Sequence, residues 1–137
     1  MGEIRVPVSV GELIDKITIL EIKSERIKDP DKLANVRKEL ALLSETWSQS
    51  ELSGRDISAE RAGLKKVNET LWEIEDAIRV SEIRKDFGKE FVELARAVYI
   101  NNDDRAALKR RLNELTGSTL TEEKDYPDYD PANGPSA

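Results

Sequence analysis

The large apolar residues of this chain recur every three or four positions along most of its length. That spacing is the period of an α-helix that buries one face. The clearest stripe consists of Leu33, Val36, Leu40, Leu43 and Trp47. Residues 3–8 alternate instead, around Pro7, which indicates a short extended arm. The pattern predicts an all-α fold, an antiparallel bundle of four or five helices with a short extended N-terminal arm and an acidic, proline-containing C-terminal tail.

Capping residues mark the starts of the first two helices. Ser9 with Glu12 three positions later has the pattern of a capping box, which predicts a first helix from residue 10 to about residue 27 or 28. Asp29 is a second N-cap residue, and Pro30 after it suits a first helical turn because its missing N–H is not needed there.

The remaining helices are separated by polar segments. Residues 48–57 are rich in serine and predict a loop, after which a third helix covers about residues 58–84. Asp86 is expected to cap a fourth helix. The acidic run at 101–104 predicts a turn and a new helix N-terminus, since acidic side chains stabilise that end of a helix. The fifth helix is then expected to end at Gly117.

The last seventeen residues differ from the rest in composition. They hold three of the five prolines, and their five acidic residues face a single lysine. We therefore expect residues 1–120 to form a single helical domain and residues 121–137 to form an acidic tail. Tyr126 and Tyr129 give the tail aromatic surface, so we expect it to be partly docked to about Tyr129, with a mobile end beyond.

Composition excludes several classes of chemistry. The chain has neither His nor Cys, which rules out disulfides, thiolate metal sites and catalysis by a Ser–His–Asp or Cys–His arrangement. Its formal net charge of −6 argues against nucleic-acid binding, which depends on clustered cations. No apolar run approaches the roughly 20 residues of a membrane span, and no signal-peptide pattern opens the chain, so we expect a cytoplasmic protein.

Polar side chains interrupt the apolar face of the first helix. Glu21 falls within its apolar arc and Glu25 follows one turn later, whereas Asp15 falls on the side expected to face solvent. A carboxylate on an apolar face is costly unless it is paired. We therefore expect Glu21 to meet a group from another helix, and the candidates are Arg79, Asn68 and Lys109.

A second set of polar residues lies along the third helix. Asn68, Trp72, Glu75 and Arg79 follow one another at i, i+4, i+7 and i+11. Glu75 and Arg79 are expected to form an i, i+4 pair, with the acid and the base in the order that stabilises a helix. Two interpretations stay open, a structural ion-pair network that fixes helix register and a polar pocket within the bundle. The candidate pocket consists of Glu21, Glu25, Asn68, Trp72, Glu75, Arg79 and Lys109.

An alternative hypothesis assigns the carboxylates to a metal. Glu73 and Asp76 form an E-x-x-D, and with Glu21 and Glu25 they resemble the all-α nucleoside-triphosphate pyrophosphatases, which hold Mg²⁺ between paired helices. The first motif of those enzymes has a double Glu followed by a third, a pattern that this chain lacks. The alternative is thus a Mg²⁺-dependent hydrolase of a phosphorylated nucleotide or sugar.

Several stretches together resemble an uncharacterised bacterial family of small helical proteins, a domain of unknown function. They are residues 9–23, which read S-V-G-E-L-x-D-K-x-T-I-L-x-I-K, with residues 68–79, 101–115 and 123–126. The resemblance implies a stand-alone helical domain or an appendage found alongside sugar-transfer or repeat proteins. It marks as signature positions Asp15, Lys16, Lys23, Asn68, Trp72, Glu75, Arg79, Arg105, Lys109, Asn113, Lys124 and Tyr126.

The sequence thus favours a cytoplasmic binding or interaction module over an enzyme, and the resemblance adds an accessory role in cell-envelope polysaccharide or glycosyl-transfer functions. We expect the partner to be a protein, self-association included. An anionic small molecule is the alternative, for which the cluster at residues 109–111 offers cations. No cofactor is expected, except Mg²⁺ under the hydrolase alternative, and neither nucleic-acid binding nor a membrane span is expected.

Overall fold

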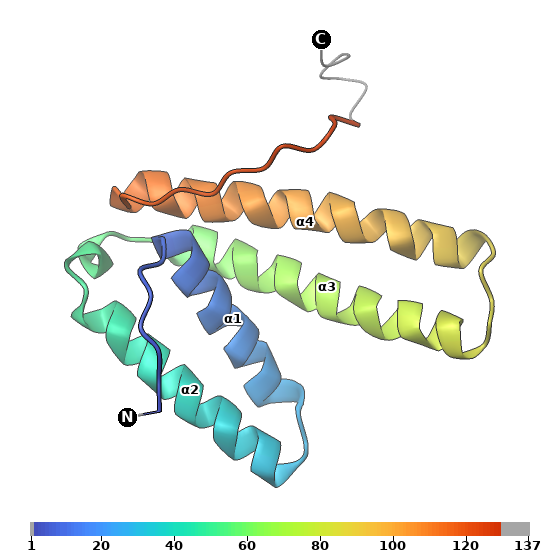
Figure 1. Ribbon diagram of the computed structural model, residues 1–137, viewed down its shortest axis with the longest axis horizontal. Helices are drawn as coiled ribbons and strands as arrows, with labels where there is room; N and C mark the ends of the chain where they lie inside the picture. Colours follow the sequence, from blue (N-terminus) through green and yellow to red (C-terminus); the bar gives the residue numbers. More distant parts are fainter. Residues whose placement is uncertain (1, 130–137) are drawn as a thin grey trace.

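The computed structural model describes residues 2–129, which form four α-helices and one short 3-10 helix (Figure 1). The elements are α1 (Val10–Arg26), α2 (Pro30–Gln49), η1 (Glu51–Gly54), α3 (Ser58–Ile83) and α4 (Lys89–Thr116). No strand occurs within the described range. The prediction of an all-α bundle is confirmed.

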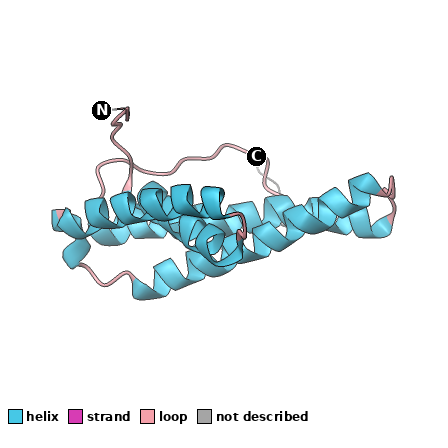
Figure 2. Cartoon of the chain, turned by 90° about the horizontal axis from the view of Figure 1, so that it is seen from below, coloured by secondary structure: helices cyan, strands magenta, loops and turns pink. Residues whose placement is uncertain are grey.

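The helices form two hairpins of unequal length. Helices α3 and α4 run antiparallel as the longer pair, and α1 and α2 lie against one half of it (Figure 1). The other half, which ends in the loop at residues 84–88, extends beyond α1 and α2 in both views (Figures 1 and 2). Helix α1 packs against α2, α3 and α4 and is the central helix of the junction.

Both predicted N-caps are confirmed. The Ser9 Oγ accepts a hydrogen bond from the Glu12 backbone N–H at 3.1 Å, and the Asp29 carboxylate accepts one from the Asp31 N–H at 2.9 Å. The capping box is only half formed, however, because the Glu12 carboxylate lies 2.7 Å from Lys109 Nζ instead of returning to Ser9. The Glu12 side chain therefore connects α1 to α4 instead of completing the capping box.

The expected break at residues 101–104 is wrong, because α4 is one continuous helix of 28 residues. Polar side chains of the 101–104 run find partners without a turn in the backbone. Asn101 donates to the Ala97 carbonyl at 2.8 Å, and Asp103 Oδ1 lies 2.9 Å from Lys124 Nζ. Packing of α4 against α3 thus overrides the local preference for a turn.

The expected cap at Asp86 is also displaced. Gly88 is the N-cap of α4, and Asp86 instead accepts a hydrogen bond from the Gly88 N–H at 3.1 Å within the loop. The predicted end at Gly117 is confirmed, since this residue has a left-handed φ of 73° that glycine adopts without strain.

The apolar core lies where the two hairpins meet. Its central side chains are inaccessible to solvent and come from three helices, namely Ile14, Ile17, Leu64 and Leu112. Helix α2 adds Trp47 from one side, and the rest of its stripe is half-buried. Among the described helices, none is long and apolar enough to cross a membrane.

Candidate functional site

A buried carboxylate joins three helices at the junction. Asp15 on α1 is only 1% exposed, and its Oδ1 lies 2.8 Å from Arg105 Nε on α4 and 2.9 Å from Asn68 Nδ2 on α3. Arg105 Nη2 also donates to the second oxygen of Asp15, and Asn68 Nδ2 lies 3.1 Å from Thr18 Oγ1. The hydrogen bond with Asp15 raises the pKa of Arg105 despite its partial burial. The carboxylate therefore holds α1, α3 and α4 in one register.

A second buried charge lies one turn further along α4. Lys109 Nζ is 2.7 Å from Glu12 Oε2 and 3.2 Å from Glu122 Oε2. Burial lowers the pKa of Lys109, but its hydrogen bonds with Glu12 and Glu122 outweigh that effect and leave the pKa above its usual value. Lys109 thus connects the start of α1 to the segment after α4.

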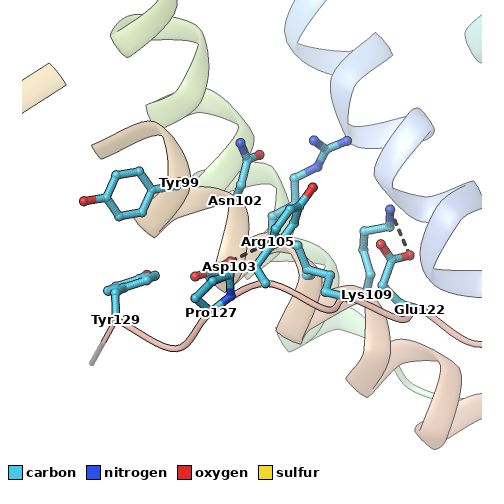
Figure 3. A pocket seen from close by; sticks show the side chains of 11 residues that line it. Tyr99, Asn102, Asp103, Arg105, Lys109, Glu122, Pro127 and Tyr129 are labelled. Carbon is cyan, nitrogen blue, oxygen red and sulfur yellow. Dashed lines mark hydrogen bonds and ion pairs between the residues drawn. The ribbon is translucent and has the colours of Figure 1, made fainter. Parts of the chain in front are cut away.

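One cavity lies between α4 and residues 122–129, and we name it the tail cavity (Figure 3). Its volume is about 550 Å³. Lys124 pairs with Asp103 at 2.9 Å, and the rings of Tyr99 and Tyr129 meet edge to face with centroids 5.1 Å apart. The tail cavity is lined by Tyr99, Asn102, Asp103, Arg105, Ala106, Lys109, Glu122, Lys124, Tyr126, Pro127 and Tyr129.

These contacts shift two pKa values in the tail cavity. Hydrogen bonds from Lys124 and Tyr129 lower the pKa of Asp103. The hydrogen bond with Asp103 raises the pKa of Tyr129 to about 12. The cations Lys109 and Lys124 are already paired with carboxylates of the chain itself.

The second cavity opens where α1 diverges from the long hairpin, and we name it the Trp72 groove. Its volume is about 570 Å³, and its lining combines apolar side chains from all three helices with charges of both signs. Arg105 and Asn102 line both cavities, so Arg105 separates them. The groove is lined by Ile19, Ile22, Lys23, Asn68, Leu71, Trp72, Glu75, Asp76, Arg79, Val98, Asn102 and Arg105.

The structure brings together four of the seven candidate pocket residues. Those in the Trp72 groove are Asn68, Trp72, Glu75 and Arg79. The other three lie elsewhere. Glu21 is 3.4 Å from Arg61, which was not among its expected partners, Glu25 is 3.0 Å from Lys65, and Lys109 lines the tail cavity. That any of these residues binds a ligand stays a prediction.

Glu75 and Arg79 form the expected i, i+4 pair at 3.6 Å, but their side chains are 51% and 76% exposed, because no described helix covers this side of α3. Asp15 was expected to face solvent and is instead the most buried acidic side chain in residues 2–129. Helix α1 is surrounded by three other helices, so the side that its own sequence marks as polar is also covered.

The carboxylates of the magnesium hypothesis do not converge. Glu21 and Glu25 pair with different cations of α3, Glu73 pairs with Arg26 at 3.4 Å, and Asp76 lies in the Trp72 groove. Within residues 2–129, no group of three or more acidic side chains is placed to hold a metal ion.

Residue patterning alone missed the central pair of the site, Asp15 and Arg105. One signal pointed to both of them, since the resemblance marks them as signature positions together with Asn68, Lys109 and Asn113. These five lie close together at the junction, where Asn113 Oδ1 accepts a hydrogen bond from the Gly11 N–H at 2.7 Å.

Comparison with known proteins gives one match. A family model described as a family of unknown function, DUF6165, matches residues 4–137. No curated protein and no solved structure matches the chain.

Proposed function

The chain belongs to this family of unknown function, DUF6165, and from that premise we propose that it is a helical protein-binding module with the Trp72 groove as its binding surface. The observation that carries the proposal is that α1 covers only one half of the long hairpin. Its last residue, Arg26, lies 3.7 Å from Glu69 and 3.4 Å from Glu73, near the middle of α3. Beyond that point no described helix packs on this face.

One face of α4 extends past the part that α1 covers. Its residues are spaced alternately four and three positions apart, and they are Phe91, Ala95, Val98, Asn102, Arg105, Lys109 and Leu112. Such spacing is typical of a helix that packs along another helix. Helix α1 supplies carboxylates to Arg105 and Lys109. Val98 lines the Trp72 groove together with the last turns of α1, Phe91 and Ala95 follow toward the loop, and all three remain half-buried. The open half therefore suits an additional helix.

The groove has the composition of a protein interface. Apolar side chains such as Trp72, Leu71 and Ile22 lie among the polar side chains of Lys23 and Arg79. An apolar centre with a polar rim is usual at such interfaces, where Trp and Arg often contribute most to affinity. We propose a cytoplasmic role accessory to cell-envelope polysaccharide or glycosyl-transfer functions, which is supported by the sequence resemblance alone.

Site-specific photocrosslinking tests the proposed function. A benzophenone amino acid replaces Trp72 in the full chain, expressed in its native host, and a matched chain carries it at Arg37, which is exposed on α2. Circular dichroism verifies that both variants fold. We expect discrete crosslinks to protein from position 72 and none from position 37. Crosslinks at neither position, or the same crosslinks at both, would contradict the proposal.

A further inference from the structure

We infer that the Trp72 groove binds the loop end of the α3–α4 hairpin of a second copy of this chain. Two hairpins would then pack antiparallel about a two-fold axis, so that each groove receives the other hairpin's end. The inference rests on the proposed function, because it names the partner of the same groove.

The loop end of the hairpin exposes apolar side chains that nothing in the described chain covers. Ile83 is 79% exposed and Phe87 is 50% exposed, although Phe87 touches Phe91 edge to face. These residues lie at the end furthest from α1 and α2 (Figure 1). An exposed apolar end and an apolar groove on the same chain give each copy both halves of an interface.

One face of α3 links the groove to this end. Asn68, Trp72, Glu75, Arg79 and Ile83 follow at intervals of three or four residues and therefore share a side of the helix. Asn68 is covered by α1, to which it is hydrogen-bonded, whereas Glu75, Arg79 and Ile83 are exposed. The face spans about 23 Å along the helix axis, which is long enough to pack against a second helix.

The charges on this face are self-complementary. Two copies of α3 that cross antiparallel, with the two-fold axis at the level of Ala77 along the helix, bring Glu75 of each copy opposite Arg79 of the other. The same arrangement sets Trp72 beside Ile83 of the second copy, so apolar contacts flank the charged ones. A symmetric interface requires such a match between a surface and itself.

A further cation at the groove fits the same arrangement. Lys23 lines the groove, and its side-chain ammonium forms no hydrogen bond or ion pair within residues 2–129. The hairpin end carries Glu82 and Asp86, which lie in the last turn of α3 and the loop after it. Arg84, Lys85 and Lys89 lie beside these acids. Because Glu82 pairs with Lys85 at 3.5 Å, Asp86 is the acid that the antiparallel arrangement leaves for Lys23.

Charge exchange tests the inference directly. Glu75→Arg and Arg79→Glu each place like charges opposite one another in a homodimer, whereas a mixture of the two variants restores both attractive contacts between copies. Sedimentation equilibrium should show a wild-type dimer, each variant dissociating at least about tenfold more readily, and a dimer in the mixture. The pair within each variant chain stays repulsive in the mixture, so only contacts between copies can restore the mass.

The matched control is an exposed pair with the same spacing at the other end of the hairpin. Arg110 and Glu114 lie 3.7 Å apart, and Arg110→Glu, Glu114→Arg and their mixture should leave the dimer unchanged. A wild-type chain that stays monomeric, or variants that fail to recover when mixed, would overturn the inference. If position 72 then crosslinks to a different protein, the proposed function stands and the inference of a second copy fails. If position 72 crosslinks to no protein, the proposed function and the inference both fail.

Discussion

The carboxylate of Asp15 and the guanidinium of Arg105, ninety positions apart in the chain, share two hydrogen bonds inside the junction of the helices. Only 1% of the Asp15 side chain is exposed, against 30% of Arg105. The carboxylate therefore depends on its partners for solvation, whereas the guanidinium retains some contact with water. Because Arg105 lines both cavities, this pair connects the stability of the fold to the shape of the candidate site.

Asp15→Ala should lower the free energy of unfolding by about 2–4 kcal/mol, because it leaves Arg105 and Asn68 without their buried acceptor. The double variant Asp15→Leu/Arg105→Leu should cost less than the sum of the two single Leu variants, since no charge is then left unpaired. Urea unfolding monitored by circular dichroism measures both effects. Strictly additive losses would mean that the pair is not coupled.

Gly11→Ala should destabilise the protein by about 2 kcal/mol or more, because α1 and α4 would have to separate. A Cβ at this position would lie 2.4 Å from the Lys109 carbonyl oxygen. Gly54→Ala is the matched control, since a Cβ at Gly54 meets nothing within 4 Å. Thermal melts of the two variants check the prediction, and equal melting temperatures would contradict the close approach of the two helices.

Local patterns predicted the helices well, because caps and apolar spacing act within a few residues. The same local reasoning failed at residues 101–104, where packing against α3 keeps α4 continuous. It also could not pair Asp15 with Arg105, or Glu21 with Arg61, because these contacts depend on how the hairpins meet. Asn68 and Trp72 were found because their polar or aromatic side chains flank an apolar stripe of their own helix.

The hydroxyl of Tyr129 should titrate with a pKa of about 12, and Asp103→Asn should lower that pKa. Because docking raises the pKa of Tyr129 above its ordinary value of 10.0, the contact stabilises the docked tail fully below pH 10. That stabilisation is lost as the pH rises toward 12. The lowered pKa of Asp103 has the opposite sense, so its contribution is present above the ordinary value of 3.8 and is lost in stronger acid. Tyrosine ring-carbon chemical shifts followed against pH report both transitions, and a pKa unaffected by Asp103→Asn would refute the contact.

Docking of the tail stays a prediction, and truncation tests it. Cutting the chain after Leu120 removes Glu122 from Lys109 and Lys124 from Asp103, so the melting temperature should fall by a few degrees, as about 1 kcal/mol does in a domain of this size. Cutting after Asp130 should leave it unchanged, although the expected mobile end lies outside the described residues. If both shortened chains melt like the full one, the tail contributes nothing to folding.

The most direct test of the account is the fluorescence of Trp72 in a Trp47→Phe chain, in which Trp72 is the sole indole. Trp47 lies in the core, so circular dichroism must first show that this variant is folded. Its emission is followed as the protein is concentrated from about 10 nM to about 100 µM, the range of most protein affinities. We predict a shift to shorter wavelength that follows the increase in mass, because the second copy would cover the groove. Emission that stays constant while the protein dimerises, or at every concentration, would contradict the claim that this groove is where two copies meet.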